Sequence, residues 1–279
     1  MPLNRIDLHV HSTASDGEFR PSEVVVLALR HRLDAIALTD HDTTAGLPEA
    51  LEAAAGSPLL VLAGVELSTM QPDGEAIDLL GYGVDPADGT FEARLRLLRS
   101  ARRDRAEQIA ARLAALGAPI SLERVYTLAA GGAVARPHIA QALLEAGHVH
   151  TIQEAFDRYI GNGGPAYVPH LPLPIEEAIA LIHAAGGVAV LAHPVRVRDY
   201  AARLGSWVDA GLDGLEVYYP DHSPTFTRDA WVAARRYGLI MTGGSDFHRP
   251  EADGTIRLGR QPVPPACVEQ ILARRERYR

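Results

Sequence analysis

Histidines and carboxylates recur in this sequence where short apolar stretches end. They are His9 and His11, Asp40 and His41, Glu66, Asp78, His193, Glu216, and Asp246 with His248. Imidazole nitrogens and carboxylate oxygens are the ligands that divalent metal ions of hard or borderline character prefer. His9 and His11 stand two positions apart, so a strand would direct both imidazoles to one side, where they can share one ion.

Two plainer interpretations of these residues remain open. His9 and His11 alone also fit two core histidines bonded to the backbone, and the whole set also fits a solvated rim of charges without an ion. Burial and mutual repulsion would, however, penalise several carboxylates that crowd one basin. The sequence therefore predicts a cluster of two or three divalent cations. His170 and His183 lie away from strand ends, and we expect surface or core histidines there.

The elements that must position these residues alternate between apolar stretches of strand length and amphipathic stretches of helix length. This alternation predicts an α/β fold with parallel strands and crossover helices. About seven such strands favour a distorted (β/α)7 barrel, with an open, doubly wound sheet as the alternative. Pro21 stands where the first residue of a helix is expected, and Gly238 follows the last turn of another helix pattern. Both positions support the predicted helices. Because the carboxyl ends of parallel strands open on one face, we expect the residues named above to meet there.

One segment breaks this alternation. From residue 91 to residue 164, helical patterns follow one another with no strand pattern between them. We therefore expect an inserted helical lid subdomain at 91–164, attached to a barrel domain formed by 1–90 and 165–279.

The inserted segment begins with a helix pattern that is rich in arginine, namely Arg94, Arg96, Arg99, Arg102, Arg103 and Arg105. Arg102 and Arg105 are our candidates for contacts with an anionic substrate. The alternative for each arginine is a solvated helix face that pairs with acidic residues of the barrel.

Two further basic positions are candidates for substrate contacts. Arg136 and His138 flank a proline at a helix start, where free amides and the helix dipole attract anions. Arg196 follows the LAHP stretch. Its guanidinium either binds a phosphate through two N–H groups or pairs with Asp199.

The composition excludes several chemistries. The chain has 279 residues, all 27 of its basic residues are arginines, and its formal net charge is −8. Without lysine, Schiff-base catalysis and a Walker-type phosphate loop are impossible. The negative charge argues against duplex DNA as a partner. A single cysteine and the absence of an apolar leader predict a cytoplasmic protein, and no stretch reaches the roughly 18 apolar residues of a membrane span.

Four motifs show a resemblance to a known family. They are DLHVHSTASDG at 7–17, LTDHDT at 38–43, GVELS at 64–68 with LAHP at 191–194, and GGSDFH at 243–248. Apart from the inserted segment, the chain resembles the PHP family, which is named for its occurrence in DNA polymerases and histidinol phosphatases and is related to the amidohydrolases. The resemblance implies a distorted seven-stranded barrel, a metal cluster at the strand ends, and hydrolysis of phosphate esters.

Carried over position by position, the resemblance implies three ions. The first would lie among His9, His11, Glu66 and Asp246, the second between Glu66 and His193, and the third among Asp16, His41 and His248. Relatives often have a histidine where this chain has Asp78, so we expect the second ion to bind weakly or to be lost on isolation. The mixed ligand set suits Mn²⁺, with Zn²⁺, Fe²⁺ or Mg²⁺ as other occupants.

Within the family, the motif order and the insertion are most similar to 3′,5′-nucleoside bisphosphate phosphatases. This implies removal of the 3′-phosphate from a small-molecule nucleotide such as pAp, with water as the nucleophile and Asp246, Glu66 and His193 as catalytic residues. A 5′ to 3′ exoribonuclease of short RNA and a histidinol-phosphatase-like phosphomonoesterase are the alternatives. Outside the family, C–N bond hydrolysis and a non-catalytic metal-binding module remain. We expect a monomer or small homo-oligomer.

Overall fold

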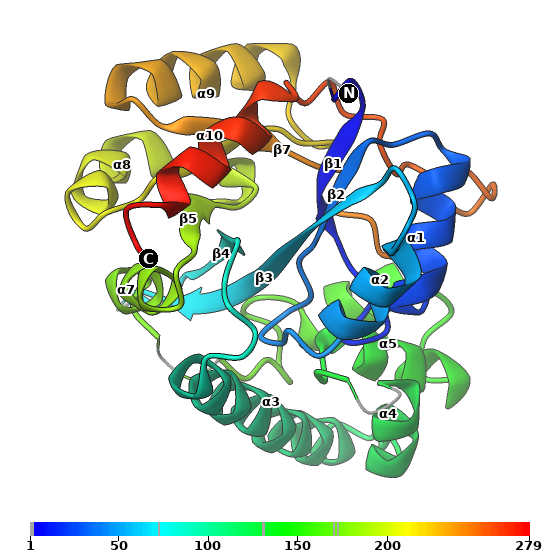
Figure 1. Cartoon of the computed structure of the whole chain (residues 1–279). Coiled ribbons are helices and arrows are strands. Elements are labelled where there is room, and N and C mark those ends of the chain that lie inside the picture. The colour runs from blue at the N-terminus through cyan, green and yellow to red at the C-terminus, as the bar shows by residue number, and fades with distance from the viewer. Residues whose placement is uncertain (1–2, 72, 130–131, 170, 172) are drawn as a thin grey trace.

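Across residues 3–71, 73–129, 132–169, 171 and 173–279, which the computed structural model describes, seven strands form one sheet. The strands are β1 Ile6–Val10, β2 Ala35–Leu38, β3 Leu60–Met70, β4 Ala76–Tyr82, β5 Val188–Leu191, β6 Gly214–Tyr218 and β7 Ile240–Gly243. Each strand is bonded to the next in sequence order, and a bridge between Val10 and Phe247 brings the segment after β7 against β1. The sheet is therefore a nearly closed barrel (Figure 1), which confirms the predicted fold class and excludes the open sheet.

Strand β4 runs against its neighbours. It pairs antiparallel with both β3 and β5, whereas the other four neighbouring pairs are parallel. A tight hairpin joins β3 to β4, and in it the amide of Gln71 donates to the carbonyl of Glu75 at 2.8 Å. A connection this short cannot return the chain to the start of β3, so β4 must run back alongside it. The expectation of parallel strands throughout is wrong at β4, because apolar patterning does not report strand direction.

Helices cover the outside of the barrel. They are α1 Pro21–Arg30, α2 Leu47–Ala54, α7 Ile175–Ala184, α8 Tyr200–Asp209, α9 Pro224–Tyr237 and α10 Ala266–Arg275. Helix α1 begins at Pro21 as predicted. Helix α9 begins after Ser223, whose hydroxyl accepts the amide of Phe226 at 3.1 Å, and it ends at Gly238 with a φ of 65°. These caps place the helix ends where the sequence signals predict them.

The chain between β4 and β5 is helical. It contains α3 Gly89–Ala115, α4 Leu122–Leu128, α5 Arg136–Glu145, α6 Ile152–Ala155 and the π-helical turn Phe156–Ile160. These helices share a hydrophobic cluster of their own, and α3, α4 and α5 lie away from α9 and α10 (Figure 1). The first turns of α3, however, pack Phe91, Leu95 and Leu98 into the barrel's cluster. Helix α3 thus belongs to both units, and the division at residue 91 stays a prediction.

Two smaller expectations concern histidines and membranes. His183 on α7 pairs with Asp213 just before β6, with 2.9 Å between Nε2 and Oδ2. His170 lies outside the described residues. Of the helices that are described, none combines the length and the hydropathy needed to cross a bilayer.

Candidate metal centre

Glu66 lies at the centre of four histidines. This residue of β3 is 1% exposed. Its Oε2 lies 3.2 Å from His9 Nε2, 3.1 Å from His11 Nε2 and 3.3 Å from His41 Nδ1. Its Oε1 lies 3.0 Å from His193 Nε2. One buried carboxylate therefore contacts imidazoles from three separate segments of the chain.

The barrel explains this convergence. His9 lies in β1 and His11 just after it, His41 follows β2, His193 follows β5, and Asp246 with His248 follows β7. Parallel strands carry these residues to one face of the barrel. Asp78 reaches the same face differently, because it stands near the start of the antiparallel strand β4. The expectation that Asp78 closes a strand is therefore wrong, although its position beside the cluster is as expected.

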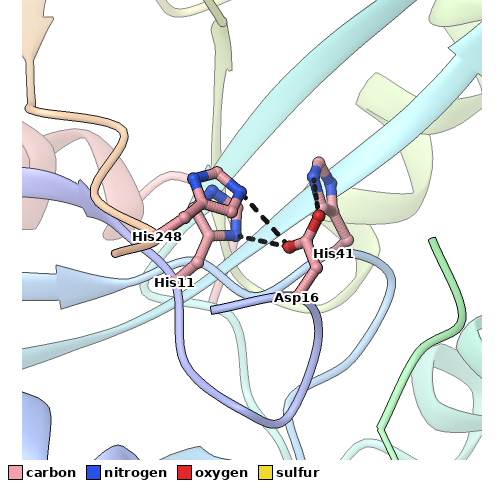
Figure 2. Close-up of side chains that lie close together, drawn as sticks. All are labelled: His11, Asp16, His41 and His248. Carbon is pink, nitrogen blue, oxygen red and sulfur yellow. Dashed lines mark ion pairs between the residues drawn. The ribbon is translucent and has the colours of Figure 1, made fainter. Parts of the chain in front are cut away.

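The side chains form three overlapping groups in which every candidate ligand atom lies within 4.8 Å of the others. The groups are His9, His11, Glu66 and Asp246; Glu66, Asp78 and His193; and His11, Asp16, His41 and His248. Figure 2 shows the last group, whose side chains point toward one another from three segments, with His11 and Asp16 on the loop after β1. Within it, His248 Nε2 lies 3.2 Å from Asp16 Oδ1. All eight residues that the resemblance implies as ligands thus lie in one cluster.

His11 belongs to two of these groups, and its two ring nitrogens face different carboxylates. A neutral imidazole has only one nitrogen with a free lone pair, so His11 can serve one ion. Its Nε2 lies 3.1 Å from Glu66 and 3.2 Å from Asp246 Oδ1, whereas its Nδ1 lies 3.9 Å from Asp16. The shorter contacts of Nε2 favour the assignment of His11 to the group that also contains His9.

The unsatisfied polar atoms of the cluster fit a metal site. Within the described residues, no hydrogen bond reaches either nitrogen of His11, Nδ1 of His41, Nδ1 of His193 or Oδ1 of Asp16, although all are buried. Buried polar atoms normally have a partner, and leaving them without one is unfavourable. Ligand atoms about 2.1 Å from a common ion stand about 3.0–3.4 Å apart, which matches the contacts around Glu66. The donor set therefore suits divalent cations.

The electrostatics of the cluster are those of a site that holds positive charge. Burial alone would raise the pKa of Glu66, but the imidazoles of His41 and His9 hold it well below its usual value. The pKa of Asp16 and that of Asp246 are lowered in the same way. Burial would lower the pKa of His11, but Asp246 and Glu66 raise it to about 10. Protons and metal ions compete for these same lone pairs.

A cavity of about 480 Å³ opens over the cluster and extends to the helical segment. Glu66, His193 and Asp246 line it together with Arg102, Arg105, Arg136 and Arg196. The structure therefore brings four of the five predicted substrate contacts into one cavity with the candidate ligands.

Two of these arginines come from α3, and each is 6% exposed. Arg102 is held in place, because its Nε donates to Asp42 Oδ2 at 2.6 Å and its Nη2 donates to Ser68 at 2.9 Å. Arg105 donates through Nε to the carbonyl of Val168 at 2.6 Å. Its buried Nη2 has no hydrogen-bond partner in the part of the chain that the structure describes.

Arg136 and His138 differ in position. Arg136 lines the cavity, and its Nη1 donates to Asn162 at 2.8 Å. His138 does not line it; its Nδ1 accepts the backbone N–H of Ala135 at 3.1 Å at the start of α5. His138 thus caps a helix, and the expected substrate contact stays an untested prediction.

Arg196 lies at the rim of the cavity. Its guanidinium stands 5.2 Å from the ring centroid of Tyr219, and its Nη2 lies 3.4 Å from Asp221 and 3.8 Å from Asp246. Its carboxylate partners are therefore Asp221 and Asp246 and not Asp199, which instead precedes the first turn of α8.

Three further residues hold the site together: sequence reasoning counted Glu216 only among the strand-end carboxylates and did not single out Asp42 or Tyr219. Glu216 contacts His9, and Asp42 pairs with Arg102. The Tyr219 hydroxyl donates to Asp246 Oδ2 at 2.9 Å, which leaves Oδ1 toward His9 and His11. Glu216 and Asp42 follow apolar stretches, but only the packed barrel shows which side chains they contact.

Comparisons with known proteins agree with this geometry. The PHP domain family matches residues 7–161. The chain is 38% identical over 272 residues to the 5′-3′ exoribonuclease Rnm of Salmonella typhimurium, covering 95% of this chain and 92% of that protein. It is 36% identical over 270 residues to a 3′,5′-nucleoside bisphosphate phosphatase of Chromobacterium violaceum, covering 95% and 94%.

A solved structure from Bifidobacterium adolescentis, described as that of a metal-dependent phosphoesterase, has the same fold. It matches with a TM-score of 0.87 and 32% identity, over 98% of both chains. The family match covers more than half of this chain, and the relatives match it along nearly their whole length. The chain therefore belongs to the PHP domain family and is a metal-dependent phosphoester hydrolase.

Proposed function

We propose that this protein removes the 3′-phosphate from 3′,5′-bisphosphonucleosides such as pAp, leaving a 5′-mononucleotide. The observation that carries the proposal is that one cavity is lined by both the acidic, histidine-rich cluster and three arginines, Arg102, Arg105 and Arg136. Such a cavity suits a small molecule with two anionic groups, one at the cluster and one at the arginines.

The cluster would hold two or three ions, with Mn²⁺ as the proposed metal. We assign His9, His11, Glu66 and Asp246 to the first ion, Glu66 and His193 to the second, and Asp16, His41 and His248 to the third. Bound divalent ions supply an acidified water and neutralise charge on the phosphoryl oxygens. Asp78 beside His193 makes the second group the richest in oxygen, which favours Mn²⁺ or Mg²⁺ there over Zn²⁺.

The chain's own groups handle the proton and the orientation. Asp246 faces the cavity, and its pKa stays well below its usual value because nearby imidazoles outweigh the effect of burial. It is therefore ionised, and we assign the proton of the attacking water or of the leaving group to Asp246 or to a histidine of the cluster. The Tyr219 hydroxyl fixes the orientation of Asp246 at 2.9 Å. Arg196 at the rim is positioned to orient the scissile phosphate.

The arginines from the helical segment would bind the second phosphate. Burial lowers the pKa of Arg105 to about 9, and the charges of Arg136 and Arg102 add to this effect. An anion among these three cations would relieve their repulsion and would give the free Nη2 of Arg105 an acceptor. Residues 91–164 would act as the lid that carries this second site.

A 5′ to 3′ exoribonuclease activity on short RNA is the second candidate. It is favoured by the 38% identity to the Salmonella enzyme. Phe156, whose ring centroid lies 5.7 Å from the Arg136 guanidinium, also lines the cavity, so an aromatic ring for a base lies beside the arginines. A terminal 5′-phosphate and the first internucleotide phosphate would present the same two anions as pAp.

Turnover of pAp, 3′-AMP and a short 5′-phosphorylated RNA in the presence of Mn²⁺ tests the proposal. We expect pAp to be hydrolysed best, and Arg105→Met to raise KM for pAp about 10–100-fold while changing 3′-AMP little, because it removes a charge-assisted contact to the 5′-phosphate. Arg103→Met is the matched control, since Arg103 is exposed on the same helix beside Tyr126. If pAp is inert and the RNA is degraded, the second candidate holds.

A further inference from the structure

Glu216, in the middle of β6, has a role in the structure that the proposed chemistry does not use. The residue is 0% exposed, and both of its carboxylate oxygens are engaged. Oε1 lies 3.0 Å from His9 Nδ1, and Oε2 accepts the backbone N–H of His193 at 2.7 Å. Among the described residues, none from β6 belongs to the three groups of candidate ligand atoms, yet this one carboxylate contacts two residues that are assigned to different ions.

The contact with His9 decides which ring nitrogen carries the proton. A carboxylate oxygen accepts hydrogen bonds and cannot donate one, so Nδ1 of His9 must carry the hydrogen. The lone pair of a neutral His9 is then on Nε2. That atom faces Glu66 Oε2 at 3.2 Å and Asp246 Oδ1 at 3.3 Å, which is the direction of the first group of ligands.

The contact with His193 acts on the backbone. His193 has a φ of 27° and a ψ of 63°, a left-handed conformation that is unfavourable for a residue with a side chain. The hydrogen bond from its amide to Glu216 holds this turn directly after β5. This turn places His193 Nε2 at 3.0 Å from Glu66 Oε1.

We propose that Glu216 is the positioning residue of the metal centre: one carboxylate sets the tautomer of His9 and the turn of His193, and so presents ligands to two ions at once. This inference rests on the proposed metal centre. Groups that orient a ligating histidine commonly change metal affinity about 10–100-fold when they are replaced. Glu216 does not line the cavity, and its two oxygens contact His9 and His193, so it would act through these neighbours.

Glu216→Gln tests the proposal because it keeps the shape and changes the hydrogen-bond pattern. The amide oxygen must stay on the N–H of His193, so the NH₂ group faces His9 Nδ1 and donates to it. The proton of His9 then moves to Nε2 and blocks the lone pair. We expect calorimetric titration of the metal-free protein with Mn²⁺ to show about 10–100-fold weaker binding at the His9 site.

Asp213→Asn is the matched control. Asp213 is a buried carboxylate directly before β6 that also accepts a hydrogen bond from an imidazole, His183, but its contacts lie away from the cluster. It should lose stability and keep the Mn²⁺ affinity of the wild type. If Glu216→Gln binds Mn²⁺ as tightly as the wild type, or if both variants weaken binding equally, the positioning role is wrong.

A measurement on the wild-type chain covers the case in which Glu216→Gln does not fold. In ¹⁵N spectra of the Zn²⁺-loaded protein, His9 should show a protonated Nδ1 and a metal-bound Nε2. A metal-bound Nδ1 would overturn the proposal. A wild-type chain that binds neither Mn²⁺ nor Zn²⁺ would instead refute the metal centre itself, so the two failures are distinguishable.

Discussion

At the scale of single residues, the site depends on a carboxylate that several imidazoles share. Glu66 Oε2 contacts His9, His11 and His41 at 3.1–3.3 Å, and Oε1 contacts His193 at 3.0 Å. The negative charge of Glu66 is essential to this arrangement, because a neutral group would attract neither metal ions nor protonated imidazoles. Protons compete with metal ions for the imidazole lone pairs. We therefore expect the side chain of Glu66 to bridge two ions, so that its loss should affect more than one of them.

Replacing Glu66 with glutamine should remove the bridge and keep the shape. For Glu66→Gln we expect fewer Mn²⁺ ions bound per chain and a kcat lower by about 10³-fold, which corresponds to several kcal/mol of lost transition-state stabilisation. Metal analysis after dialysis and steady-state kinetics with pAp measure both. Glu49→Gln is the control, since Glu49 accepts a hydrogen bond from Ser22 away from the cluster. Unchanged metal content and turnover in Glu66→Gln would contradict the bridging role.

At the scale of elements, the site exists because short segments after the strands are attached to helices of the inserted region. Asp42, which follows β2 with a φ of 51°, is 2% exposed and accepts Arg102 Nε of α3 at 2.6 Å. Its other oxygen accepts the amide of Ser68 in β3 at 3.1 Å. This buried ion pair fixes α3 next to His41, so the helix that carries the cavity arginines also stabilises the loop that carries a candidate ligand.

Breaking this ion pair should destabilise the protein. In Arg102→Met the carboxylate of Asp42 stays buried without its cation, and we expect the free energy of unfolding to fall by about 3–5 kcal/mol. The double variant Arg102→Met with Asp42→Asn should recover part of that loss, because the uncompensated charge is gone. Urea unfolding of the two variants and the wild type measures the difference. An unchanged midpoint for Arg102→Met would contradict the stabilising role of this ion pair.

At the scale of the whole molecule, the order of the strands along the chain could be predicted from the sequence, and so could the face on which the candidate ligands meet. The direction of β4 and the contacts between side chains across the barrel could not. Ligand candidates at strand ends converge because the barrel orders its strands by sequence, so His9, His193 and Asp246 could be assigned to one face in advance. The reversal of β4 could not, because alternating apolar residues look the same in both directions. Glu216 stood among the strand-end carboxylates without a role, since its two partners come from β1 and the turn after β5.

The end of the barrel away from the cluster should report on stability through pH. Asp213 accepts hydrogen bonds there from His183, Arg274 and Tyr278 at 2.8–2.9 Å, and so ties α7 and the C-terminal segment to the start of β6. Burial would raise the pKa of Asp213, but these bonds outweigh it and lower the pKa below its usual value.

A carboxyl group whose pKa is lower in the folded state stabilises the fold above its unfolded pKa, near 3.9, and loses that contribution as the pH falls through the folded pKa. Asp213→Asn should therefore lower the free energy of unfolding by about 2–4 kcal/mol at pH 7, and its difference from the wild type should shrink only below about pH 4. Denaturant unfolding of both proteins from pH 7 to pH 3 measures this difference, from which carboxylates common to both proteins cancel. A difference that stays constant down to pH 3 would mean that the charge of Asp213 contributes nothing to the attachment of α10.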